Sequence, residues 1–293
     1  MANKGPVYVL ACYILWGVLP VFWKTLSAVD SLYVLAGRIV WSMVFITAIM
    51  LGQKKLDRIR AVLSDKKELV RLALAGVFVC INWGSYIIAV NSGRGVDASL
   101  AYYMNPILAI LLGTIVFREK LTGLQWLSVA VTFTGLVVTA IRYQQIPWMS
   151  LVIGGSFAVY GAIKKGVHVE PGVSLFYETA ILAPFALVFM LVSELRGNGA
   201  VGVLGGTQWL LLPISGIVTT VPLLCYAKGI KTTPMTLSGI LMYINPTLQL
   251  LVAVVLYHEA FTATHAILFA FVWTGLAMYL IAGMRRRKKG AAK

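Results

Sequence analysis

The sequence is poor in charged residues, and it is poorest in acidic ones. Charged side chains make up 12% of the 293 residues, with 10 Asp and Glu against 25 Lys and Arg, whereas 59% of the residues are hydrophobic. A typical soluble domain has about a quarter of its residues charged. So few charges could not cover the surface of a water-soluble fold of this length. We therefore expect the chain to lie in a lipid bilayer.

Catalytic and cofactor-binding motifs are absent from the sequence. The glycines Gly161 and Gly166 are followed by Val167-His168, not by the Lys-Ser or Lys-Thr of an ATP-binding loop. The three histidines lack zinc-protease spacing, and no Gly-x-Ser-x-Gly motif occurs. The three cysteines fall in apolar segments without metal-ligand spacing. We therefore expect no catalytic site, no metal site and no cofactor, and we expect the protein not to be an enzyme.

Apolar segments long enough to cross a bilayer recur along the whole chain. A helical span needs about 20 apolar residues, and backbone groups in lipid must be satisfied within the segment. The alternating pattern of a β-barrel is absent. The sequence therefore predicts an all-α integral membrane protein with ten transmembrane helices. They are expected over residues 5–24, 32–52, 71–91, 98–117, 123–141, 148–163, 172–193, 207–227, 236–256 and 265–283.

The basic residues predict the orientation of these helices. Ten spans place both termini on one side, and that side collects 20 of the 25 Lys and Arg residues, in Lys4, the alternate connections and the tail. The opposite connections hold only Arg94, Arg142 and Arg196. Because positive residues accumulate in the cytoplasm, we expect both termini to be cytoplasmic. This distribution also explains the net charge of +15 without a nucleic-acid partner.

The two halves of the chain resemble each other at a constant offset of 140 residues. The matched residues are Tyr86 with Tyr226, Tyr103 with Tyr243, Asn105-Pro106 with Asn245-Pro246, Glu119 with Glu259, and Thr134-Gly135 with Thr274-Gly275. Because each half holds five predicted spans, the second half enters the membrane from the opposite face. We expect two inverted five-helix repeats, over residues 1–145 and 146–293, an arrangement typical of transporters. A duplication kept only for fold stability is the other interpretation.

Several motifs along the chain are similar to those of a known family. They are Trp16-Gly17 with Pro20 and Lys24, Arg38 to Ser42, Asn82-Trp83, Ala89 to Asn91, Ala98 to Leu100, Asn105-Pro106, Phe157 to Gly161, Gly216 to Pro222, and Pro246 to Leu248. On these motifs the chain resembles the RarD-type permeases of the drug/metabolite transporter superfamily, which are built from two EamA-type repeats. The resemblance implies a carrier of the bacterial inner membrane. Gly37 departs from the family pattern, in which a histidine is expected before the arginine.

Two charged residues fall inside predicted spans. Arg38 and Glu178 each lie about six residues into a helix, from opposite faces, and they are 140 residues apart. Charges at membrane depth are costly and indicate function by default. We expect Arg38 to attract an anionic group of a substrate, and Glu178 to attract a cation or accept a proton. The alternative is that each bonds the polar groups of a neighbouring helix.

Three prolines inside predicted spans are candidate hinges. Pro106 and Pro246 follow Asn105 and Asn245 near the middle of their helices, and Pro222 lies in a third. Each proline removes an amide hydrogen and frees a carbonyl four residues earlier, which is tolerated at membrane depth beside protein polar groups or a wet cavity. We expect these prolines to act as hinges around a central cavity. Packing kinks stabilised by the asparagines are the alternative.

Aromatic and polar side chains complete the predicted cavity. The candidates are Trp16, Asn82, Trp83, Tyr86, Tyr103, Tyr160, Tyr226 and Tyr243. An aromatic lining with few charges suits amphipathic solutes and organic cations. Any one of these aromatics is more often a packing residue or an interfacial anchor, so only the whole set, with its repeat symmetry, indicates a cavity.

Helix starts are predicted at two equivalent places in the repeat. Thr122 and Thr262 suit the N-cap position, and Glu119 and Glu259 lie just before them. We expect each glutamate to serve the start of its own following helix.

Taken together, these features predict a secondary transporter that exports a small amphipathic metabolite or drug across the cytoplasmic membrane by alternating access. Its expected partners are that solute, the lipid bilayer and a proton as the candidate coupling ion. A membrane-embedded enzyme or lipid-handling protein is a second hypothesis, in which Arg38 and Glu178 act on a lipid-linked substrate. A receptor or scaffold that transports nothing is a third.

Overall fold

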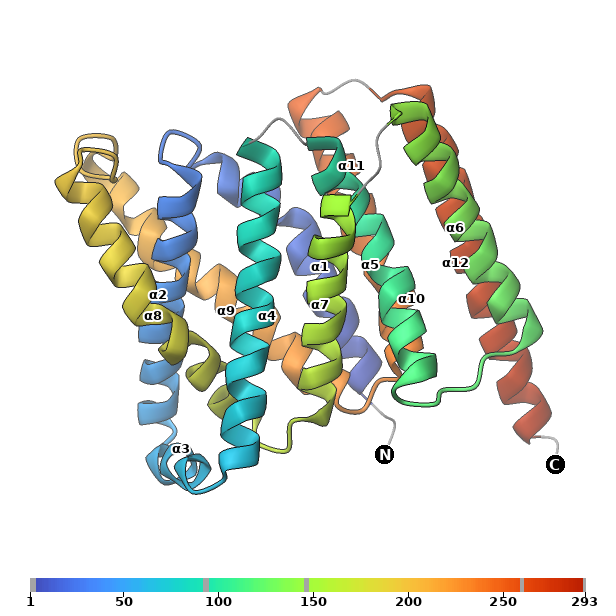
Figure 1. The fold of residues 1–293 in the computed structure, drawn as a ribbon, viewed down its shortest axis with the longest axis horizontal. Coiled ribbons are helices and arrows are strands. Elements are labelled where there is room, and N and C mark those ends of the chain that lie inside the picture. Colours follow the sequence, from blue (N-terminus) through green and yellow to red (C-terminus); the bar gives the residue numbers. More distant parts are fainter. Residues whose placement is uncertain (1–3, 92–94, 145–147, 259–260, 292–293) are drawn as a thin grey trace.

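The computed structural model describes residues 4–91, 95–144, 148–258 and 261–291, and these ranges contain helices and connections but no strand (Figure 1). The helices are α1 Gly5–Lys24, α2 Ser31–Gly52, α3 Leu56–Leu63, α4 Lys66–Asn91, α5 Gly95–Ile115, α6 Gly123–Tyr143, α7 Trp148–Gly166, α8 Pro171–Leu195, η1 Gly206–Leu210, α9 Leu211–Ile230, α10 Met235–Met242, α11 Ile244–Leu251, η2 Val252–Leu256 and α12 Ala263–Ala291. The all-α prediction is confirmed for the part of the chain that the structure describes.

Eight segments of the described chain are long and apolar enough to cross a membrane. They are α1, α2, α4 up to Ala89, α6, α8, η1 with α9, α10 with α11 and η2, and α12 up to Arg285. The prediction of a multi-pass membrane protein is therefore confirmed. Two further long helices, α5 and α7, pack against each other beside these segments.

Capping residues define where several helices begin. The Asp30 carboxylate accepts hydrogen bonds from the backbone N–H groups of Leu32 (2.9 Å) and Tyr33 (3.0 Å) at the start of α2. Thr122 and Gln125 form a reciprocal capping box at the start of α6, which confirms Thr122 as an N-cap. The basic connection after α2 differs from the prediction, because it folds into the short helix α3 and α4 begins at Lys66 rather than at residue 71.

Helices from the two halves of the chain interleave. Helix α2 packs on α8 and α9, α1 on α9, α10 and α11, α4 on α7 and α8, and α5 on α7 and α10. Helices α6 and α12 pack on each other and form one side of the molecule (Figure 1). The crossing of α5 and α10 is close because Gly239 lacks a side chain, and a methyl group there would lie 2.7 Å from the Pro106 carbonyl oxygen. Small residues allow such close helix packing in membranes.

The predicted helix over residues 236–256 is irregular. It divides at Tyr243 into α10 and α11, and it ends in the π-helical segment η2. Pro246 explains the division, because it cannot donate a hydrogen bond to the carbonyl of Met242. Helix α5 runs through Pro106 without a break, so the two equivalent prolines do not interrupt their helices equally.

Glu119 caps a different helix from the one expected. Its carboxylate accepts hydrogen bonds from the backbone N–H groups of Met235 (2.6 Å) and Thr236 (2.9 Å), the first two residues of α10. Helix N-termini attract negative charge, and the connection before α6 brings Glu119 to this one. The carboxylate therefore joins the two halves of the chain. Its counterpart Glu259 lies outside the described residues.

We expect the substitution Glu119→Ala to lower the free energy of unfolding by about 1–3 kcal/mol, because it removes two charge-assisted hydrogen bonds from a helix N-terminus. Thermal unfolding of the purified protein in detergent measures the effect. Asp57→Ala, at an exposed carboxylate on α3, is the control and should leave stability nearly unchanged. Equal unfolding curves for the two variants would contradict the capping role.

Candidate functional site

A cavity of about 500 Å³ lies between helices from both halves of the chain. Its volume falls in the range of small-molecule sites, about 300–1,000 Å³. The wall consists of Trp16, Leu19, Pro20, Trp23, Leu26, Ser27, Val29, Ser31, Val34, Leu35, Arg38, Asn82, Trp83, Tyr86, Ile87, Ala101, Tyr102, Asn105, Ile153, Phe157, Thr219, Met242, Asn245 and Gln249. The residues from Leu26 to Val29 belong to the connection between α1 and α2, so the cavity reaches that end of the bundle.

Arg38 is the only charged residue among the described residues of this wall. Its guanidinium carbon lies 4.0 Å from the ring centroid of Trp83 and 5.1 Å from that of Trp23. The Nε atom is buried and has no hydrogen-bond partner. The described structure also gives Arg38 no ion pair. Two aromatic faces thus hold the cation in place and leave its N–H donors without an acceptor.

Four amide side chains contribute to the other polarity in the wall. Asn82 donates a hydrogen bond from Nδ2 to the carbonyl oxygen of Ile153 (2.6 Å), which joins α4 to α7. Gln249 donates to Asn245 Oδ1 (2.8 Å) along one face of α11. Asn105 differs from these, because its Oδ1 atom is buried without a partner. The cavity therefore contains an acceptor that a bound molecule could satisfy.

Seven of the twelve residues predicted for the pathway lie in this wall, namely Trp16, Arg38, Asn82, Trp83, Tyr86, Asn105 and Asn245. Tyr103 and Tyr243 do not, because they pack in a core with residues of α6 and α12, where the Tyr243 hydroxyl donates to the Tyr103 carbonyl oxygen (3.3 Å). The tyrosine of α5 in the wall is Tyr102. Successive helix positions differ by about 100°, so the side chain of Tyr103 points away from the cavity when that of Tyr102 lines it. Pathway roles for Tyr103 and Tyr243 stay predictions.

Tyr160 and Tyr226 lie in an aromatic cluster beside the cavity. Their rings stack at a centroid distance of 6.0 Å and an interplanar angle of 16°. Phe157, whose ring centroid lies 5.5 Å from that of Tyr226, and Trp16, at 6.0 Å, connect this pair to the cavity wall. Both tyrosines are buried. We call these four residues the aromatic layer.

Glu178 is bound to a buried lysine. Its Oε1 atom lies 2.5 Å from Lys164 Nζ, and both side chains are at most 2% exposed. Ser174 donates to the same carboxylate oxygen (2.7 Å), and Tyr160 donates to Oε2 (3.1 Å). The helix expected over residues 148–163 ends just before Lys164, whereas α7 continues to Gly166 and so includes this lysine. A role for Glu178 in binding a cation or proton stays a prediction, and in this structure its carboxylate is satisfied.

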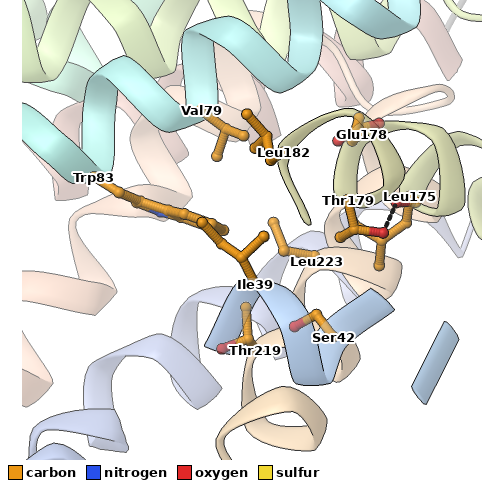
Figure 2. Close-up of a pocket in the computed structure, with 10 residues that line it drawn as sticks. All are labelled: Ile39, Ser42, Val79, Trp83, Leu175, Glu178, Thr179, Leu182, Thr219 and Leu223. Carbon is orange, nitrogen blue, oxygen red and sulfur yellow. Dashed lines mark hydrogen bonds between the residues drawn. The ribbon is translucent and has the colours of Figure 1, made fainter. Parts of the chain in front are cut away.

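A second cavity of about 10 Å³ separates Glu178 from the large one. Figure 2 shows Trp83 on one side of it and Glu178 on the opposite side, with Ser42 and Thr219 along its lower edge. Trp83 and Thr219 also belong to the wall of the large cavity. The Thr219 hydroxyl is buried and has no hydrogen-bond partner. A space of this size holds about one water molecule, and it shares two wall residues with the large cavity while it borders Glu178.

The predicted pathway omits seventeen of the 24 wall residues, among them Trp23, Tyr102, Thr219 and Gln249. The sequence could predict Gln249 as a wall residue, because it lies four positions after Asn245 and therefore on the same helix face. Tyr102 and Thr219 carry no such signal. Each has a similar residue beside it, Tyr103 or Thr220, and the helical pattern alone does not decide which one faces the cavity.

The EamA-like transporter family matches this sequence twice, over residues 3–141 and 146–281. The chain belongs to this family. The EamA-like chain is 37% identical to "Uncharacterized transporter YojE" of Bacillus subtilis (strain 168), over 98% of this chain and 96% of that protein. It is 34% identical to "Protein RarD" of Streptomyces exfoliatus, over 99% and 92% of the two chains. The predicted resemblance to RarD-type proteins is confirmed.

A solved crystal structure has the same fold as this EamA-like protein. The two superpose with a TM-score of 0.74 over 96% of this chain and 99% of the other, at 20% sequence identity. At this identity the likeness concerns the fold alone.

We expect the single substitutions Lys164→Met and Glu178→Met in this EamA-like protein each to lower the free energy of unfolding by about 3–5 kcal/mol, because each leaves a buried charge without its partner. The double substitution should recover most of that loss. Denaturant unfolding in detergent micelles measures all three. Glu170→Gln, at a partly exposed carboxylate 2.5 Å from Arg58, should cost less than about 1 kcal/mol. A double variant as unstable as the sum of the two single variants would contradict a coupled ion pair.

Proposed function

We propose that this protein is a secondary transporter that exports a small amphipathic metabolite or drug across the bacterial cytoplasmic membrane by alternating access. The single observation that carries the proposal is the 500 Å³ cavity, whose wall is built by helices of both halves of a membrane protein. Trp16, Trp23, Trp83 and Phe157 give this wall a large aromatic surface, which suits the apolar part of such a solute.

We further propose ten transmembrane helices, with α5 and α7 as the two spans beyond the eight apolar segments, arranged as two inverted repeats. The double family match supports the repeat. The packing supports it as well, because contacts occur in pairs that the repeat would exchange. Helix α1 packs on α9 as α7 packs on α4, and α2 packs on α9 as α8 packs on α4. Inverted repeats of this kind hold the substrate site of many transporters at their interface.

The observed conformation is proposed to face outward. The cavity reaches the connection between α1 and α2, residues 25–30, which lies on the outer side if the positive-inside rule holds. Toward the cytoplasm, the aromatic layer and the buried Lys164–Glu178 pair are proposed to close the path, and the cavity that borders Glu178 has a volume of about 10 Å³. Alternating access then requires this layer to open while the outer end closes.

Export is tested by flux in proteoliposomes, with a panel of labelled amphipathic solutes and with or without a pH gradient. We expect counterflow of at least one solute, chemically unchanged by mass spectrometry. Trp83→Phe should reduce its rate about tenfold or more, because Trp83 borders both cavities and holds Arg38. A change of rate with the imposed pH gradient would support proton coupling.

The matched control for that experiment is Trp126→Phe, which alters a tryptophan that is 45% exposed on α6. It should leave the flux unchanged. A chemically altered solute would favour the membrane-enzyme hypothesis, and the absence of counterflow for the whole panel would contradict transport.

The orientation is tested with a matched pair of new cysteines at exposed serines, Ser27→Cys and Ser64→Cys. A membrane-impermeant maleimide added to intact cells should label the first variant and not the second, because the two serines lie at opposite ends of the bundle. Val34→Cys, in the cavity wall, should also react from outside and resist the same reagent in everted vesicles. The unaltered protein supplies the background from its native cysteines. Labelling of Ser64→Cys in intact cells would overturn the orientation.

A further inference from the structure

The electrostatics of the large cavity indicate which class of solute it binds. Its described wall contains one positive charge, Arg38, and no carboxylate. An organic cation entering this space would be repelled by the guanidinium and would meet no acidic partner. An anion would meet the only charge in the wall, at a depth where water screens charges weakly.

The guanidinium of Arg38 lacks hydrogen-bond acceptors among the described residues, and its geometry indicates which kind of group would supply them. A guanidinium carries five N–H donors in one plane, yet the described structure gives this one only the ring faces of Trp23 and Trp83. Aromatic faces stabilise a cation but accept no conventional hydrogen bond in its plane. The group that matches a planar fork of donors is a carboxylate or a similar oxyanion, which binds in a bidentate manner. The two rings also restrict the orientation in which that anion can approach.

A second unsatisfied atom borders the same cavity. Asn105 Oδ1 is buried without a donor, and a buried acceptor in this condition is destabilising. A solute with a hydroxyl or amine group would supply the missing donor. The apolar part of the solute would lie against the aromatic rings that make up much of the wall.

We propose that the cavity binds a soluble organic monoanion, with a carboxylate at Arg38, a hydrogen-bond donor at Asn105 and a flat apolar body between them. The inference rests on the proposed transport function, because it names the class of solute for the same cavity. An anionic lipid headgroup has the same oxyanion chemistry. The structure favours a soluble molecule, because the wall includes the connection that ends at the aqueous side of the bundle, at Ser27 and Val29.

Binding is tested in phosphatidylcholine nanodiscs with three solutes that share one skeleton, namely 4-hydroxyphenylacetate, its neutral amide and the cation tyramine. Quenching of tryptophan fluorescence measures the affinity, since three tryptophans line the wall. We expect the anion to bind about tenfold or more tightly than the amide or the amine, as a charge-assisted bidentate contact implies. Arg38→Gln should abolish this preference and weaken the anion about tenfold or more, with the amide changed less than about twofold. Arg38→Lys should keep a preference for the anion at lower affinity.

Arg142→Gln is the matched control, because this arginine is exposed at the end of α6, and it should bind all three solutes as the unaltered protein does. Thermal unfolding verifies that each variant is folded. Equal binding of the three solutes by the unaltered protein would overturn the proposal, as would an anion preference that survives in Arg38→Gln or no saturable binding of any solute. Repeating the titration with phosphatidylglycerol in the nanodisc should leave the affinity unchanged. Loss of solute binding there would identify the lipid headgroup as the occupant and would also overturn the proposal.

The same experiments separate this inference from the transport proposal. Arg38-dependent binding of the anion without any flux in proteoliposomes would support the inference and contradict transport. Flux of neutral or cationic solutes that Arg38→Gln leaves unchanged would support transport and contradict the inference about the anion.

Discussion

In the hydrocarbon of a bilayer, every polar or charged group must find its partner within the protein. This constraint makes the chain helical, and it also explains its internal ion pair and its caps. Lys164 and Glu178 are buried together, and Glu119 satisfies the N-terminus of α10 across the two halves of the chain. Five buried side-chain atoms of the described residues lack a hydrogen-bond partner. Those of Arg38, Asn105 and Thr219 belong to residues of the large cavity's wall, whereas those of Glu170 and Thr220 do not.

The backbone follows the same constraint. Its main irregularity within an apolar segment is the break between α10 and α11 with the π-helical segment that follows, and Met242, Asn245 and Gln249 of this region belong to the cavity wall. Irregular backbone at membrane depth is tolerated where it is buried in protein or lines a cavity, and π-helical turns are frequent at functional sites. The opposite half lacks this break, because α5 continues through Pro106. The two Asn-Pro positions that lie 140 residues apart therefore differ in backbone geometry.

The sequence is sufficient to predict the class of the protein, because long apolar segments with scarce acidic residues are typical of proteins that cross a bilayer. It is less informative about the site. In a soluble protein an apolar helix face marks the core, but in a membrane the lipid-facing surface is equally apolar, so the pattern does not tell Tyr102 from Tyr103. Charged residues within a span are easier to recognise as candidate site residues, since a charge in the bilayer has a high free-energy cost wherever it lies. Even so, the sequence alone places Lys164 in a connection, because its partner Glu178 is on another helix and only the fold brings them together.

One sequence relation acquires a meaning from the structure. The offset of 140 residues that relates the halves pairs Lys164 with Lys24 and Glu178 with Arg38. In the second half the two positions carry opposite charges and form a buried ion pair. In the first half both are positive, and Lys24 lies over the ring of Tyr257 while Arg38 faces the cavity. In the proposed transport cycle the two repeats exchange roles. The position in the first half that corresponds to Glu178 is Arg38, so the outer end has no negative charge at this position. A bound organic anion would supply that negative charge. The proposed class of solute would then favour closure of the outer end of the cavity.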